Sequence, residues 1–203
     1  MADVFQLGVL ISGTGTTLQN LIDRIADGRL GGVAIAIVIS SRGDVEGVAR
    51  AHGAGLPVEI VSPREFSSPA AFSARLVEVL EAHRVALAVQ AGWMCYWRLP
   101  DRWLGRVLNV HPSLLPDFGG KGYYGRRVHE VVLLAGRSES GATVHIVDNQ
   151  YDHGPVVLQR RCAVLPDDTV DSLARRVAAI ERELLPAAIE QARDGRLPRH
   201  RAG

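Results

Sequence analysis

The sequence predicts an α/β fold, a single doubly wound domain with a mostly parallel sheet. Continuous apolar runs indicate strands that are buried on both faces. Helical patterns alternate with these strands, as they do when helices cover both sides of a parallel sheet. In the last third of the chain two strands follow one another across a short turn, so we expect that part of the sheet to be antiparallel.

The alternation of strand and helix is clearest in the first half of the chain. A turn of small residues, Ser12 to Thr16, separates the first strand from the first helix, and Asp44 is a candidate N-cap for the second helix. The expected strands span residues 4–11, 33–39, 58–61, 85–91 and 106–110. The expected helices span residues 17–26, 44–55 and 69–83.

The second half begins with a long loop, residues 111–125, that is rich in Gly, Pro and Tyr. Its further elements are expected at residues 126–134 (helix), 141–148 and 155–165 (strands) and 169–193 (helix). Gly195 should end the last helix, and Pro186 should kink it. No repeat or linker divides the chain, so we expect one domain over residues 1–203.

Composition excludes several classes of protein. Of the 203 residues, 47% are hydrophobic and 22% are charged, which excludes wholesale disorder. Lys and Arg number 23 against 22 Asp and Glu, a net charge of +1 that gives no case for a nucleic-acid surface. The longest apolar run, residues 33–39, falls far short of the roughly 18 residues of a membrane span.

The chain also lacks the patterns of secretion and metal binding. Its first residues carry no basic segment followed by an apolar one, so we expect a cytoplasmic setting. Cys95 and Cys162 do not have the spacing of metal ligands, and the seven His residues include no His-x-x-x-His pair. We therefore expect no metal ion.

The first candidate site is the turn Gly13-Thr14-Gly15-Thr16 between a buried strand and a helix. Small residues let backbone N–H groups approach an anion at a helix N-terminus, and Ser12 and Thr17 beside the turn add hydroxyl groups. The turn lacks the spacing of a dinucleotide fingerprint and the Lys of a P-loop. It therefore suits a monophosphate, and the alternative is a tight turn with a Thr N-cap.

The second candidate is Asn109 and His111, which lie two residues apart at the end of a predicted strand. Their side chains should point to the same side, at the carboxyl end where α/β folds place their sites. An amide donor beside an imidazole suits acyl-group chemistry, because the amide stabilises an oxyanion while the imidazole moves a proton. The alternative is a structural hydrogen-bonded pair.

The third candidate is Asp152, on the predicted turn between two strands. It could hold an imidazole and raise its pKa, or it could simply bond the backbone of its own turn. Gly154 nearby indicates an unusual backbone angle. Cys95 has no base fixed to it by sequence and is a weak candidate nucleophile. Three Trp residues after the fourth strand indicate core packing or a pocket for a planar ligand: Trp93, Trp97 and Trp103.

Taken in order, these segments resemble the folate-dependent formyltransferases, and most closely the members that formylate glycinamide ribonucleotide in purine biosynthesis. The resemblance covers nearly the whole chain. Its strongest pieces are residues 10–19 (LISGTGTTLQ), 90–94 (QAGWM), 109–116 (NVHPSLLP), 141–145 (GATVH) and 152–155 (DHGP).

The resemblance implies a Rossmann-like seven-stranded sheet and roles for particular residues. It implies the catalytic set Asn109, His111 and Asp152. The substrate-binding residues that it implies are Gly13, Thr14, Gly15 and Thr16 for the ribonucleotide phosphate and Glu181 for the ribose. The folate-binding residues that it implies are Gly92, Trp93, Met94 and His145.

The chain departs from the family pattern at three places. Cys95 and Pro69 stand where many members have Arg, and Arg64 is a candidate substitute for the second. The loop 118–125 lacks the usual Pro-Gly-x-His pattern, and its Lys121 could contact an anion or be solvated. We interpret these differences as marks of a subgroup with the same reaction.

The resemblance implies direct transfer of the formyl group of 10-formyltetrahydrofolate to the amine of glycinamide ribonucleotide. Asn109 and a protonated His111 would stabilise the oxyanion, and Asp152 would raise the pKa of His111 and order a water. Small-molecule substrates are the expected partners, with the chain a monomer or homodimer. A tRNA formyltransferase or a formyltetrahydrofolate hydrolase would need a further domain. A sugar-nucleotide formyltransferase and a non-catalytic nucleotide-binding module remain alternatives.

Overall fold

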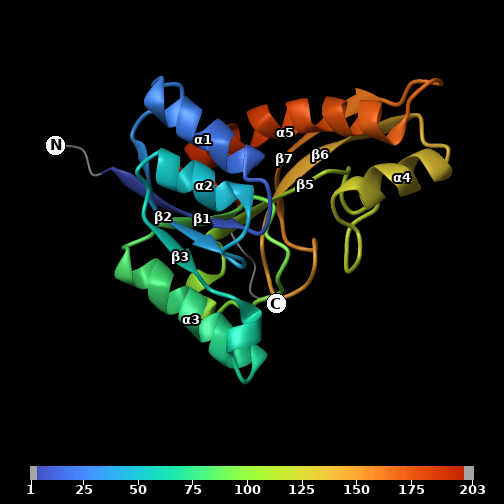
Figure 1. The fold of residues 1–203 in the computed structure, drawn as a ribbon. Helices are drawn as coiled ribbons and strands as arrows, with labels where there is room; N and C mark the ends of the chain where they lie inside the picture. The colour runs from blue at the N-terminus through green and yellow to red at the C-terminus, as the bar shows by residue number, and fades with distance from the viewer. Residues whose placement is uncertain (1–3, 199–203) are drawn as a thin grey trace. The chain divides into compact units, whose positions relative to one another are not determined.

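A computed structural model of the chain describes residues 4–198 (Figure 1). The prediction that the chain has no secretion signal concerns its first residues, and residues 1–3 lie outside the described part. Within that part, seven strands form one sheet in the order β3-β2-β1-β4-β5-β6-β7. Strands β1 to β4 are parallel and the pair β6-β7 is antiparallel, which confirms the predicted fold class.

The described residues group into two compact units, one ending at Leu108 and the other starting at Asn109. The first unit holds the strands β1 (Phe5–Ile11), β2 (Val33–Ser40), β3 (Val58–Ile60) and β4 (Leu87–Gln90). Its helices are α1 (Thr16–Ala26), α2 (Glu46–Gly53) and α3 (Pro69–Ala82), with short 3₁₀ turns at Pro63–Glu65 and Asp101–Trp103. Figure 1 shows α1 and α2 on one side of these strands and α3 on the other, as a doubly wound sheet requires.

The core of the first unit follows directly from the apolar runs of the sequence. Strand β1 lies between β2 and β4, and its residues from Leu7 to Ile11 are all buried. In β2 the last four residues are buried as well. A strand with parallel neighbours on both sides and helices on both faces has no solvent-facing positions, so it needs no polar alternation.

The start of α2 differs from the prediction. The N-cap is Val45, which makes no side-chain cap hydrogen bond, and the expected cap Asp44 instead accepts hydrogen bonds from Arg42. The helix begins against the turn after β1, where the Gly47 amide donates to the Gly13 carbonyl at 3.1 Å. This long-range contact fixes the helix start, so the prediction of Asp44 as the cap was wrong.

The second unit carries β5 (Val107–His111) from Asn109 onward, followed by α4 (Arg126–Leu134). Strands β6 (Glu139–Ile146) and β7 (Val156–Ala163) then pair in antiparallel fashion, and α5 (Val170–Arg193) packs against both of them and against α4. Thr169 and Ser172 cap α5 through reciprocal hydrogen bonds. The helix continues through Pro186 to Arg193.

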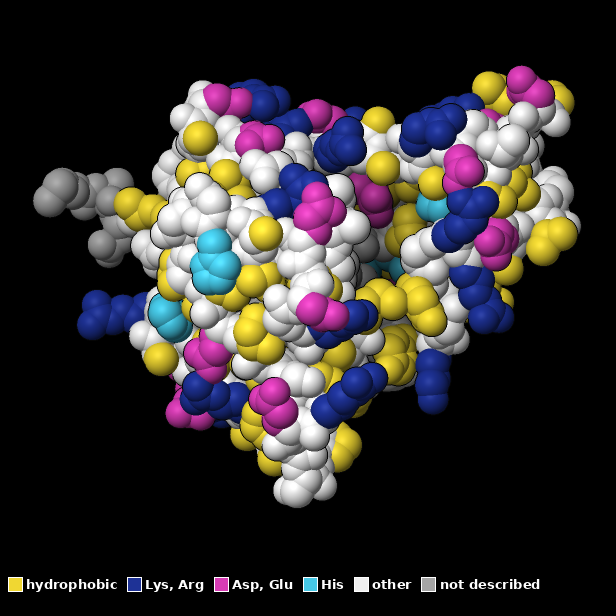
Figure 2. All heavy atoms as spheres, in the orientation of Figure 1, with side chains coloured by type: hydrophobic (Ala, Val, Ile, Leu, Met, Phe, Trp, Pro, Cys, Tyr) yellow, Lys and Arg dark blue, Asp and Glu magenta, His cyan; other side chains and the backbone are white. Residues whose placement is uncertain are grey.

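The surface carries charges of both signs. On the face drawn in Figure 2, Lys and Arg side chains alternate with Asp and Glu, in keeping with the net charge of +1. Among the described residues, no helix combines the length and apolarity that a membrane crossing requires.

The close packing of α2 on the turn after β1 gives a test of the fold. A methyl group on Gly47 would lie 2.7 Å from Ile11 Cδ1 and 2.9 Å from the Gly13 carbonyl oxygen. We expect Gly47→Ala to lower the free energy of unfolding by about 1–3 kcal/mol, the usual effect of overpacking. Urea denaturation followed by circular dichroism measures this change.

Gly53→Ala is the matched control, because it lies on the same helix and a methyl group there meets nothing within 4 Å. It should leave stability unchanged or raise it slightly. Equal effects of the two substitutions would contradict the packing argument.

Candidate active site

The predicted residues Asn109, His111 and Asp152 meet in the second unit. Asn109 and His111 lie on β5, and Asp152 lies in the turn between β6 and β7. The Asp152 carboxylate has Oδ1 3.4 Å from Asn109 Nδ2 and Oδ2 3.5 Å from His111 Nδ1. The structure therefore brings together an amide, an imidazole and a carboxylate within contact distance.

His145 on β6 joins the same cluster. Its Nε2 lies 3.1 Å from Asn109 Nδ2 and 3.5 Å from Asp152 Oδ1, and its Nδ1 donates to the Ile146 carbonyl. In the neutral ring Nε2 then accepts from Asn109, whereas the imidazolium would donate to Asp152. The sequence assigned His145 to folate binding, but its side chain is buried against Asn109 and Asp152.

The loop after β5 contributes two backbone groups that the sequence did not single out. His111 Nε2 donates to the Phe118 carbonyl at 2.9 Å, and the Gly120 amide donates to Asp152 Oδ2 at 2.9 Å. Between them, a methyl group on Gly119 would lie 2.5 Å from Leu115 Cδ2 and 3.2 Å from Asp152 Cβ. This stretch of loop therefore contacts both titratable groups through its backbone, and Gly120 within it has a φ of 96°, which favours glycine.

The turn between β6 and β7 presents the Asp152 carboxylate to the cluster. Asp152 itself has a positive φ of 51°, and its carboxylate contacts Asn109 on β5 and the Gly120 amide in the loop, both outside its own turn. The unusual angle predicted at Gly154 is wrong, because its φ is not in the positive region. A methyl group there would instead lie 1.9 Å from the Ile146 carbonyl oxygen, so close backbone approach explains this glycine.

Burial and charge act in opposite directions on the two titratable partners. Burial lowers the pKa of His111 and outweighs the Asp152 carboxylate and the Phe118 carbonyl, which both raise it. Burial would raise the pKa of Asp152, but His145, His111 and the Gly120 amide outweigh it and hold that pKa below its usual value. Asp152 does raise the pKa of His111 as predicted, but burial outweighs it, so the net shift goes against the protonated His111 that was expected and favours a neutral imidazole beside a carboxylate.

The predicted phosphate turn, Gly13 to Thr16, lies in the first unit between β1 and α1. The N-cap of α1 is Gly15, with a φ of 71° and no side-chain cap, so the alternative of a Thr N-cap is wrong. The first intrahelical amide is that of Gln19, which bonds Gly15, so the preceding amides have no acceptor in the helix. Arg50 also donates to the Thr14 carbonyl at 2.9 Å.

The predicted folate segment, Gly92 to Met94, follows β4 in the same unit. Gly92 and Met94 are exposed, but Trp93 is buried and stacks on Phe72 with ring centroids 6.2 Å apart. The indole therefore belongs to the core, as do those of Trp97 and Trp103. Burial raises the pKa of the Cys95 thiol, which disfavours the thiolate that a nucleophile requires.

The other predicted site residues lie apart from the hydrogen-bonded cluster. Burial raises the pKa of Glu181 on α5 to about 7, so near neutral pH this carboxyl exists in both protonation states. Lys121 is exposed on its loop, and Arg64 and Pro69 are exposed around the start of α3. Among residues 4–198, no three His, Cys, Asp or Glu side chains are grouped to hold a metal ion.

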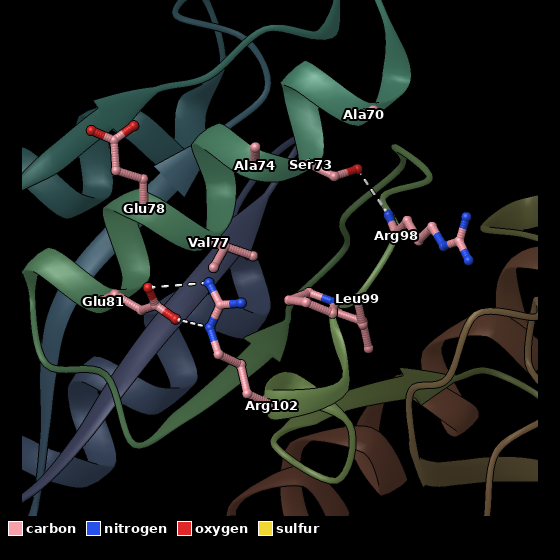
Figure 3. A pocket seen from close by; sticks show the side chains of 10 residues that line it. Ala70, Ser73, Ala74, Val77, Glu78, Glu81, Arg98, Leu99 and Arg102 are labelled. Atoms are coloured by element: carbon pink, nitrogen blue, oxygen red, sulfur yellow. Dashed lines mark hydrogen bonds and ion pairs between the residues drawn. The ribbon is translucent and has the colours of Figure 1, made fainter. Parts of the chain in front are cut away.

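A pocket of about 440 Å³ opens between α3 and residues 98–102 (Figure 3). Its lining includes Val77 and Leu99, with the ion pair of Glu81 and Arg102 at its edge. None of the residues predicted for catalysis or for substrate binding lines this pocket.

Comparison with known proteins identifies the family of this arrangement. The family described as Formyl transferase matches residues 6–189. The chain belongs to the formyl transferase family. This confirms the resemblance that the motifs indicate.

Relatives match over nearly the whole chain. Trifunctional purine biosynthetic protein adenosine-3 of Drosophila melanogaster is 41% identical over 91% of this chain and 14% of its own length. Phosphoribosylglycinamide formyltransferase of Haemophilus influenzae is 34% identical over 95% of this chain and 89% of its own length. The crystal structure of glycinamide ribonucleotide transformylase 1 from Symbiobacterium toebii matches with a TM-score of 0.90 and 39% identity, covering 98% of this chain and 92% of that one. The chain thus spans less than a fifth of the trifunctional relatives it matches.

The opposing influences on His111 predict the effect of removing the carboxylate. Asp152→Asn removes the negative charge that raises the pKa of His111, whereas the burial that lowers it remains. The pKa of His111 should therefore fall further below its ordinary value of about 6.5. An NMR titration of the imidazole signals, assigned with a His111→Asn variant, measures this shift. Asp148→Asn is the control, because Asp148 pairs with His153 and should leave His111 unchanged. A rise in the pKa of His111 in Asp152→Asn would contradict the argument.

Proposed function

We propose that the protein transfers the formyl group of 10-formyltetrahydrofolate to the amine of glycinamide ribonucleotide, working as one formyltransferase domain in the cytoplasm. The observation that carries the proposal is the meeting of Asn109, His111 and Asp152 in a chain of the formyl transferase family. Relatives named as phosphoribosylglycinamide formyltransferases support the choice of acceptor.

The reaction joins the acceptor nitrogen to the formyl carbon and breaks the bond between that carbon and N10 of the folate. The amine attacks first, and the carbonyl oxygen becomes an oxyanion. Asn109 Nδ2 and His111 Nε2 are the donors proposed to bind it. In the free protein these nitrogens lie beside Asp152, His145 and the Phe118 carbonyl, so the substrate oxygen takes the place of those partners. One such donor contributes about 10²–10³ in rate.

The amine loses a proton and N10 of the folate gains one. The Asp152 carboxylate, with its lowered pKa, is ionised at neutral pH and is proposed to order the water that carries this proton. His111 is neutral before the reaction, because burial lowers its pKa. It therefore donates a hydrogen bond from Nε2 as a neutral imidazole and keeps its proton, while the proton of the amine moves to N10 through the ordered water.

The phosphate of the ribonucleotide is proposed to bind the turn from Gly13 to Thr16. Support comes from the free amides at the start of α1, where the helix dipole also favours a dianion. The Glu181 carboxyl, with a pKa of about 7, is proposed to bond the ribose. Gly92 and Met94 are proposed to line the folate pocket with exposed backbone, since the Trp93 ring is buried.

Removing the imidazole tests the catalytic set. His111→Ala should lower kcat by at least about 10², because it removes an oxyanion donor. The measurement is an absorbance assay of formyl loss from 10-formyltetrahydrofolate, with glycinamide ribonucleotide as acceptor. His153→Ala is the control, since His153 is exposed and pairs with Asp148 outside the cluster. Near-normal kcat in a folded His111→Ala variant would remove His111 from the mechanism.

Changes at the turn test the acceptor's phosphate. Thr14→Pro removes one amide donor, so the KM for the ribonucleotide should rise while the KM for the folate changes little. Thr14→Ala is the control, because it keeps the amide and loses only the hydroxyl. Inorganic phosphate should compete with the ribonucleotide and not with the folate. If the dephosphorylated riboside reacts equally well, the phosphate site is misassigned and another amine, such as a sugar nucleotide, is the acceptor.

A further inference from the structure

Ser12, which follows β1, is the centre of a small hydrogen-bond network in the first unit. Its Oγ accepts a hydrogen bond from the Met94 amide at 3.0 Å and another from Ser41 Oγ at 2.8 Å. The Cys95 thiol bonds the same two hydroxyls. The sequence predicted Ser12 as one more hydroxyl donor toward a phosphate, and the structure adds that its oxygen accepts hydrogen bonds from two neighbouring segments.

The topology of the sheet explains why these residues meet. Strand β1 lies between β2 and β4, and all three are parallel, so their carboxyl ends share one edge. Ser12 comes directly after β1, Ser41 directly after β2, and Met94 a few residues after β4. Ser12 thus ties the turn proposed for the acceptor phosphate to the segment proposed for the folate.

The segment that Ser12 holds has no regular structure of its own. Residues 93–100 belong to no helix or strand, so their amides need other acceptors. A second serine meets this need farther along, where Ser73 Oγ on α3 accepts from the Arg98 amide at 2.9 Å (Figure 3). Ser73 in turn donates to the Pro69 carbonyl within α3. Two buried or half-buried hydroxyls therefore fix the two ends of one irregular stretch.

We propose that Ser12 is a positioning residue that couples the two substrate subsites, by holding the Met94 backbone against the end of the acceptor turn. The inference rests on the proposed function and adds a residue that touches neither reacting group. Its hydroxyl oxygen accepts two hydrogen bonds from other segments, so the positioning role needs no direct contact with the phosphate. Ser73 fixes the far end of the segment against α3 and has no bond to the turn.

The test compares Ser12→Ala with Ser73→Ala in the full chain. Loss of one hydrogen bond changes an equilibrium roughly threefold to tenfold. Ser12→Ala should therefore raise the KM for both the ribonucleotide and 10-formyltetrahydrofolate by that factor, with a smaller change in kcat. Ser73→Ala should leave the KM for the ribonucleotide unchanged.

Binding of tetrahydrofolate, followed by the fluorescence of Trp93 and Trp97 in the same segment, measures the folate effect without turnover. Its Kd should rise in Ser12→Ala by the same factor as the KM. If only the KM for the ribonucleotide rises, Ser12 contacts the phosphate directly and the coupling is wrong. If only the folate constants rise, or if neither substrate is affected, the coupling is also wrong.

Ser41→Ala gives a second variant should Ser12→Ala fail to fold, because it removes the buried hydroxyl that donates to Ser12. It should raise the KM for the ribonucleotide and the KM for the folate, each by a smaller factor than Ser12→Ala does. Unchanged values would overturn the proposal. The wild-type protein separates the two hypotheses. Absence of formyl transfer in the wild type refutes the proposed function, whereas an active wild type with unaltered Ser12→Ala and Ser41→Ala variants refutes only the coupling.

Discussion

The arrangement of the candidate site depends on the carboxylate of Asp152. Its two oxygens face groups from three segments: Asn109 and His111 on β5, His145 on β6 and the Gly120 amide in the loop. Replacing it by an apolar side chain would take this acceptor away from the Asn109 side-chain amide and the Gly120 backbone amide, which is more unfavourable than losing one exposed hydrogen bond. The positive φ of Asp152 is tolerated because these contacts together exceed the strain of a left-handed residue.

In the first unit the equivalent constraint is close backbone packing at the ends of parallel strands. Gly15 and Gly47 approach each other so closely that a methyl group on either would contact the other's backbone. Helix α2 packs against the turn and fixes its backbone, as the hydrogen bond from the Gly47 amide to the Gly13 carbonyl shows. Because no side chain caps α1, the amides at the start of that helix are left without a side-chain acceptor. A site made of backbone amides has no side chain to reveal it. Its geometry comes entirely from what packs around it.

The sequence predicted the fold well because its strands are continuous apolar runs, and such runs are buried in any parallel sheet. Asn109 and His111 were predictable as neighbours because alternate residues of a strand share a face. Asp44 and Gly154 were interpreted wrongly, since their roles depend on Arg42 and on the Ile146 carbonyl, which local pattern does not specify. The Phe118 carbonyl and the link from Ser12 to Met94 were missed for the same reason. A backbone partner leaves no residue signature, whether it lies seven residues away, as Phe118 does from His111, or 82 away, as Met94 does from Ser12.

The direction of the His111 pKa changes how the proposed chemistry works. A cationic imidazole would be a stronger donor to an oxyanion from Nε2, while its Nδ1–H would face the Asp152 carboxylate. Burial favours the neutral ring, in which Nε2–H donates to the Phe118 carbonyl and Nδ1, without a proton, faces Asp152. An oxyanion accepts a hydrogen bond better than a carbonyl does, and the exchange therefore favours the charged intermediate over the free state. In the proposed reaction, the Phe118 carbonyl would give up this hydrogen bond to the developing oxyanion. The proposed mechanism thus stabilises the oxyanion with a neutral donor, the His111 Nε2–H, near the Asp152 carboxylate, and it assigns no step to a metal ion or a further cation.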